Sequence, residues 1–123
     1  MVTKLFTKHL NDCEKIIAND GCYLKELLHP KNDPVELPYS FSVAAVAVGE
    51  STYHHYLKQT EVYFILEGKG LLHVGTETSN LIKGGSAIVP PHKEQWLENT
   101  GSSELEFIVI VSPPWCEEDD IRT

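Results

Sequence analysis

The stretch HHYLKQTEVYFILEGKG, from His54 to Gly70, sets two adjacent histidines and Glu61 ahead of a hydrophobic segment. The segment EVYFILEG is rich in β-branched and aromatic residues, and the Gly-x-Gly that follows is typical of a turn. Only the short connection KQT separates this segment from STYHHYL before it. The pattern predicts two neighbouring strands that bring histidine and carboxylate side chains close together.

The flanking sequence continues as short strands separated by turns. Gly75-Thr76-Glu77 lies between GLLHV and TSNLI, which is a hairpin signal. Proline, asparagine and glycine mark further turns at PPHK and NTGSSE. About eight or nine strands with turns at this spacing predict an all-β antiparallel sandwich or barrel. The expected strands cover residues 22–28, 39–48, 51–57, 61–68, 70–74, 78–82, 86–90, 94–99 and 105–111.

A short helix is expected near the N-terminus, over residues 10–18. Asn11 is suited to cap it, and Glu14 stands at the capping-box position. The sequence NDG at 19–21 ends the helical pattern with a turn.

Length and composition indicate one globular domain. The chain has 123 residues and a hydrophobic content of 41%, enough for a single core. Residues 19–116 carry the expected strands. The acidic residues 117–123 show no regular pattern and are expected to form a solvated tail. We therefore expect one domain over residues 1–123.

Charge and cysteine content restrict the partners and the compartment. The formal charge is −8 and no basic stripe is present, so neither nucleic acid nor an anionic membrane is an expected partner. The apolar runs are strand-length, and the first residues lack the apolar region of a signal peptide. Cys13, Cys22 and Cys116 cannot all pair within one chain. Free thiols in a reducing compartment are the simpler interpretation, which predicts a cytoplasmic protein.

Two motifs stand out in their order along the chain. GESTYHHYLKQTEVYFILEG, residues 49–68, contains a glycine, a histidine pair, a glutamate and a closing glycine. GSAIVPPHKEQWLENTG, residues 85–101, contains a glycine, a proline turn and an asparagine. Together they resemble the cupin family. The resemblance implies a double-stranded β-helix, a jelly-roll barrel with a ligand site inside.

The resemblance also implies a metal site. In metal-binding cupins, three histidines and a glutamate hold the metal. The family's His-x-His pair falls on His54 and Tyr56 if four residues separate it from Glu61, and on His55 and Leu57 if three do. The first register keeps polar groups at both positions, and we prefer it. In the second motif a glutamine replaces the family's histidine. The implied metal ligands are His54, Tyr56, Glu61 and Gln95.

Such a set would hold a divalent transition metal, Fe, Mn, Ni or Zn, more weakly than three imidazoles do. The phenol of Tyr56 must ionise from a pKa of ~10, and an amide is a poor ligand for these metals. The alternative is a cavity without metal, in which the same side chains bond to each other and to a ligand. The sequence leaves both interpretations open.

Other side chains near the motifs have expected positions. Tyr63 shares the face of Glu61 and is expected in the core or in the substrate pocket. His92, in the proline turn, is expected at the rim of that pocket. His55 is expected on the opposite face, with a structural or interface role. Trp115 is expected to anchor the tail.

Two functions fit these features. An enzyme would use His54 or Glu61 as the base and Tyr56 as the acid, to act as an isomerase or lyase on a small sugar or organic acid. A binding module would hold a small molecule without turnover. Small cupins commonly pair through edge strands, and the apolar run VAAVAV suggests buried surface beyond one barrel. We therefore expect a homodimer.

Overall fold

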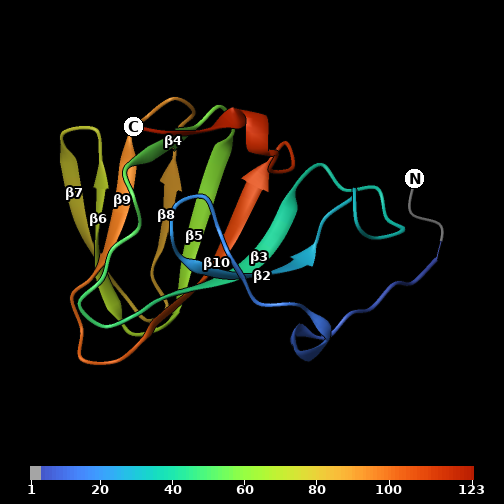
Figure 1. Cartoon of the computed structure of the whole chain (residues 1–123), viewed down its shortest axis with the longest axis horizontal. Helices are drawn as coiled ribbons and strands as arrows, with labels where there is room; N and C mark the ends of the chain where they lie inside the picture. Colours follow the sequence, from blue (N-terminus) through green and yellow to red (C-terminus); the bar gives the residue numbers. More distant parts are fainter. Residues whose placement is uncertain (1–3) are drawn as a thin grey trace.

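The computed structural model describes residues 4–123, which form eleven strands in two antiparallel sheets (Figure 1). In spatial order, the first sheet holds β1 (Ile16–Ile17), β2 (Tyr23–Leu28), β3 (Ser40–Val46), β10 (Leu105–Ser112), β5 (Thr60–Glu67) and β8 (Ser86–Val89). The second sheet holds β11 (Asp120–Arg122), β4 (His55–Leu57), β9 (Gln95–Asn99), β6 (Lys69–Val74) and β7 (Glu77–Ile82). The all-β prediction is confirmed. Within residues 4–123, no helix is long and apolar enough to cross a membrane.

The strands follow the period-two pattern of side chains that face a core on one side. In β3 the buried positions are Ser40, Ser42, Ala44 and Val46, with half-buried residues between them. The β6–β7 hairpin turns at Gly75, whose φ of +59° lies in the left-handed region that glycine tolerates. The expected strand 51–57 is shorter than predicted, because only its last three residues form β4.

One end of the space between the sheets is filled with hydrocarbon. Ile65, Leu97 and Leu105 have no exposed surface, and Phe107 is nearly as buried. The Phe107 ring meets the Tyr63 ring edge-to-face, with 5.5 Å between the ring centroids. Close contact between large buried apolar side chains is typical of a protein interior.

The helix expected over residues 10–18 is wrong. Only Leu10–Asp12 form a 3-10 turn, and His9 caps it in place of Asn11. The chain then extends, and Ile16–Ile17 pair with β2 as strand β1. A helix of this length is marginal in water, while β-branched isoleucines suit a sheet edge.

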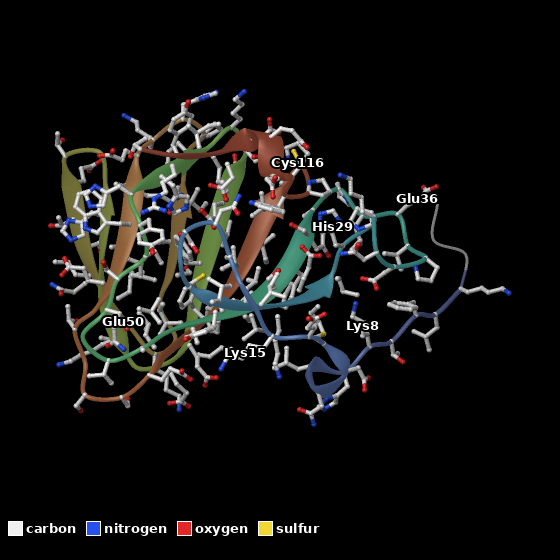
Figure 2. The ribbon with its side chains drawn as sticks, viewed as in Figure 1. Lys8, Lys15, His29, Glu36, Glu50 and Cys116 are labelled. Carbon is white, nitrogen blue, oxygen red and sulfur yellow. The ribbon has the colours of Figure 1, made fainter. Side chains whose placement is uncertain are left out.

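The C-terminal residues 117–123 also differ from the expected solvated tail. They form a 3-10 turn, Glu117–Asp119, and strand β11, which pairs with β4. Trp115 anchors this segment, as its indole Nε1 donates to Asp120 Oδ2 at 2.9 Å. Figure 2 shows Cys116 and His29 at the same end of the barrel, where His29 Nε2 donates to the carbonyl of Trp115 at 2.7 Å.

Candidate functional site

A cavity of about 330 Å³ lies at the end of the barrel opposite the packed hydrocarbon. Its volume is at the low end of the roughly 300–1,000 Å³ range of small-molecule sites. Its wall is formed by β1 and the turn that follows it, by the start of β11 and the 3-10 turn before it, and by β2, β3, β4, β5 and β10. The lining side chains that can form hydrogen bonds or transfer protons include Asp20, Cys22, His55, Glu61, Trp115 and Asp120.

A chain of hydrogen bonds holds Glu61 in this wall. Glu61 begins the inward row of β5 and is 5% exposed, and Gln95 of β9 has no exposed surface. Gln95 Nε2 donates to Glu61 Oε1 at 2.6 Å. The hydroxyl of Tyr63 donates to Gln95 Oε1 at 2.5 Å. Both polar atoms of the Gln95 amide are therefore used within the protein.

Burial changes the acidity of Glu61. Loss of solvation raises the pKa of its carboxyl from 4.5 to about 7, and the charges of Asp20 and Asp120 also raise it. The imidazole of His55 and the hydrogen bond from Gln95 act in the opposite direction. A carboxyl with a pKa near neutrality can both donate and accept a proton under ordinary conditions.

His55 lies beside Glu61 in the cavity and is 2% exposed. Its Nδ1 lies 2.9 Å from the carbonyl oxygen of Tyr53. A carbonyl can only accept, so Nδ1 carries a hydrogen and Nε2 is left to take up a proton. Nε2 lies 3.9 Å from Asp20 Oδ2, too far for a hydrogen bond but close enough for attraction once the ring is charged. The backbone N–H of Tyr53 donates to the carbonyl of Asp20 at 2.6 Å, which ties the two segments together.

The preferred register of the first motif is wrong. His54 is exposed, and its ring stacks on Trp96 outside the barrel with 3.7 Å between centroids. Tyr56 is also on the outer side of β4, where its ring lies 6.2 Å from that of His92. His55, expected to face outward, points inward instead. Side chains alternate along a strand, so a shift of one residue exchanges the two faces.

The two residues assigned to the substrate pocket lie elsewhere. Tyr63 is buried behind Glu61 and does not border the cavity; it supports Gln95. His92 is exposed in its turn, with a φ of 67°, and its backbone N–H donates to the carbonyl of Leu57 at 2.7 Å. Neither ring contacts the cavity.

The sequence is similar to a known protein family and to a protein of another organism. The cupin domain family model matches residues 42–111, more than half of the chain. This chain belongs to the cupin family. It is 33% identical over 121 residues to the uncharacterised protein MJ1618 of Methanocaldococcus jannaschii, covering 97% of this chain and 96% of that protein.

Solved structures support the same cupin fold. Oxalate decarboxylase of Lactobacillus farciminis, solved as a formate complex, superposes with a TM-score of 0.84 at 20% identity, over 98% of this chain and 36% of the decarboxylase. The polyketide cyclase RemF of Streptomyces resistomycificus gives a TM-score of 0.75 at 17% identity, over 94% of this chain and 89% of the cyclase. Cupin neighbours thus include enzymes, and at these identities the likeness concerns the fold.

The side chains of this cupin do not fit the family's metal. In the observed register the histidine pair becomes His55 and Leu57, and Leu57 is a buried hydrocarbon. The amide of Gln95 is already committed to Glu61 and Tyr63. Within the described part of the chain, no three His, Cys, Asp or Glu side chains are arranged to hold a metal ion. One imidazole and one carboxylate are too few for a transition-metal site.

Sequence reasoning missed three groups of the cavity wall. Asp20 lies in the turn after β1, and Asp120 starts β11 in the supposed tail. Cys22 is buried beside them, and burial raises the pKa of its thiol well above its usual range, so it stays protonated. Neither aspartate belongs to a periodic pattern. For His55 a signal did exist, because it precedes Glu61 by an even number of residues, and such a spacing places both side chains on the same face.

Proposed function

We propose that this cupin binds a small polar metabolite in the cavity and moves protons on it with His55 and Glu61, without a transition metal. The observation that carries the proposal is that both side chains border one cavity while each is held from behind. The carbonyl of Tyr53 fixes His55, and Gln95 fixes Glu61. Positioned acid–base groups of this kind contribute about 10²–10⁴-fold to a rate.

The two groups have complementary roles. Nε2 of His55 accepts a proton from a carbon or hydroxyl of the ligand, and the tautomer set by Tyr53 keeps its lone pair available. Protonated Glu61 gives a proton to a neighbouring atom or to a departing oxygen. Exchange with solvent returns the proton from His55 to Glu61 after product release. The net reaction is an isomerisation or an elimination of the lyase type.

Deuterium uptake tests the proposal. Purified protein is treated with a chelator, its metal content is measured by atomic emission, and it is incubated in D₂O with a panel of small hydroxy- and amino-carbonyl compounds. We expect NMR to detect deuterium in at least one compound, with loss of uptake in His55→Gln and Glu61→Gln. His54→Gln, on the outer face, is the matched control and retains uptake. Uptake that vanishes on chelation and returns with Fe, Mn, Ni or Zn contradicts the metal-free mechanism.

A non-catalytic binding module is the second candidate. The observation that favours it is the closed chain from Tyr63 through Gln95 to Glu61, which gives the carboxylate a structural partner. In that case, ligands raise the thermal stability of the protein, as binding to the folded state must, while no deuterium is taken up.

We further propose that two copies associate through the outer face of the first sheet. The strand register aligns Ile88, Val62, Ile110 and Phe41 in one row across β8, β5, β10 and β3. In the adjacent row Phe64 is 38% exposed. A row of apolar side chains across four strands is more than scattered surface residues.

Light scattering after size-exclusion chromatography tests the dimer. We expect a mass twice that of the 13.8 kDa chain, and a single-chain mass for Phe64→Lys. Ile82→Lys, at an exposed apolar position of β7 in the other sheet, is the control and leaves the mass unchanged. A single-chain mass for the unmodified protein contradicts the proposal.

A further inference from the structure

The charges that border the cavity have one sign. Its carboxylates are Asp20, Glu26, Glu61, Glu117 and Asp120. The lining includes one imidazole, His55, and no Lys or Arg among the described residues. An anionic ligand would enter this space against carboxylates at close range, with no cation to offset them.

The carboxylates surround the space from separate segments. Asp20 comes from the turn after β1, Glu61 from β5 and Asp120 from β11. Burial is the main cause that raises the pKa of Glu61, and the charges of Asp20 and Asp120 raise it further. The three carboxyl groups therefore repel one another electrostatically. Burial is also the main cause that raises the pKa of Asp120, with Asp20 and Glu117 adding to it. A positive ligand relieves this repulsion.

Two polar atoms of the wall lack a hydrogen-bond partner. Asp120 Oδ2 accepts from Trp115, but Asp120 Oδ1 is buried and accepts from no described residue. His55 is almost wholly buried, its Nδ1 is used by Tyr53, and its Nε2 makes no hydrogen bond with the described residues. Buried polar groups without partners are costly. The wall is therefore short of hydrogen-bond donors.

The shape of the site favours an organic cation over a metal ion. The acidic groups do not converge on one point, as the absence of any metal-ligating trio in residues 4–123 shows. Hydrocarbon side chains make up much of the rest of the wall, among them Leu24, Leu57, Val109 and Val111. Trp115 adds an indole, the ring that cations prefer.

We propose that the cavity selects a small molecule with an apolar body and a protonated nitrogen, which the carboxylates of Asp20 and Asp120 attract while Glu61 keeps its proton. The inference rests on the proposed function, in which the same cavity holds the substrate, and it names the substrate class as an organic amine. The hydrocarbon wall receives the apolar body, and the ammonium supplies the donors that the wall lacks.

Three probes with one carbon skeleton test the charge. 3-Methylbutylamine, 3-methylbutan-1-ol and 3-methylbutanoate are titrated into the isotope-labelled full chain, and binding is followed by NMR shifts of residues around the cavity. We expect the amine to bind about tenfold more tightly than the alcohol, which corresponds to one charge contact of about 1.4 kcal/mol, and the carboxylate not to bind. Added salt should narrow the gap between amine and alcohol.

Variants locate the effect. We expect Asp20→Asn and Asp120→Asn each to weaken binding of the amine by about three- to tenfold while leaving the alcohol unchanged. Glu77→Gln, on the exposed β6–β7 hairpin, removes the same charge far from the cavity and leaves all three affinities unchanged. The salt dependence in unmodified protein still tests the charge if one aspartate variant does not fold.

The outcomes separate this inference from the proposed function. Equal binding of amine and alcohol, or tighter binding of the carboxylate, overturns the charge selectivity while the cavity remains a ligand site. Shifts that map outside the cavity, or no binding of any probe, overturn the ligand site as well.

Discussion

The two ends of the barrel are built by the same strands, yet they differ in chemistry. β5 points Ile65 into the packed end and Glu61 into the cavity end, and β9 points Leu97 and Gln95 in the same way. The change takes place within four residues of one strand. One strand can therefore contribute to both the core and a site. Only the type of residue at its inward-facing positions has to change.

The difference has an energetic basis. The packed end removes large apolar side chains from water, at about 25 cal/mol per Å². The cavity end buries a carboxyl, an imidazole and an amide, which is unfavourable unless they are hydrogen-bonded. The first end thus offsets the cost of the second, and variants at the two ends should behave differently.

Matched leucines give the largest expected effect. Leu97 has no exposed surface in the packed end, and Leu57 is 3% exposed beside the cavity. Of the roughly 2–5 kcal/mol range for leucine-to-alanine changes, we expect Leu97→Ala near the top and Leu57→Ala near the bottom, because the latter enlarges an existing space. Urea unfolding measures both free energies. Equal losses of unfolding free energy in the two variants would contradict the energetic difference between the two ends.

The pH dependence of stability isolates Glu61. Its pKa in the folded protein is about 7, above the usual 4.5, so the folded state holds this proton more tightly than the unfolded state. Its contribution is complete below pH 4.5 and is lost as the pH rises through about 7. At about 1.4 kcal/mol per pH unit, the change over this window is roughly 3 kcal/mol.

Glu61→Gln is the corresponding control. This variant keeps an oxygen to accept from Gln95 and removes the titration. Between pH 4.5 and 7, we expect the free energy of unfolding of this variant to fall by roughly 3 kcal/mol less than that of the unmodified protein. The opposite slope difference would mean that Glu61 is ionised more easily in the folded chain than in the unfolded one.

Loss of the buried amide should have a somewhat smaller effect. Gln95→Leu keeps the volume but leaves Glu61 and the hydroxyl of Tyr63 without their partner. We expect a loss of about 1–3 kcal/mol, measured by urea unfolding. The pKa of Glu61 should rise further, because the donor that lowers it is gone. Asn80→Leu, an exposed amide of β7, serves as the control and should stay within about 0.5 kcal/mol.

The smallest effect is expected outside both ends. His54→Ala removes a ring stacked on Trp96 and should cost about 0.5–1.5 kcal/mol. Amine binding in the cavity should not change, in contrast to Asp20→Asn. NMR titration with 3-methylbutylamine makes this comparison. A loss of binding in His54→Ala would show that the outer face influences the cavity.

The sequence predicted the strands well because each is short and bounded by a turn. The prediction failed on the first motif, since we preferred polar residues at both positions of the histidine pair. That preference outweighed the alternation of side chains along a strand. Buried positions run without interruption through His55, Leu57, Gln59 and Glu61. The connection KQT keeps the alternation, so counting in steps of two from Glu61 identifies His55.

The remaining site residues could not be predicted in this way. Asp20 follows a two-residue strand, and Asp120 belongs to a strand that forms only by pairing with β4. Their positions depend on tertiary contacts, for which local sequence carries little information. The same applies to Ile16–Ile17, whose pairing with β2 replaces the expected helix.

The docking of β11 on β4 has a consequence for synthesis. Ribosomes make a chain from its N-terminus, so β1 to β10 emerge before Asp120 does. Until that residue is free to dock, one wall of the cavity is missing and the space stays open to water. A nascent chain can therefore assemble its hydrocarbon core first, and the wall of the cavity is completed only afterwards.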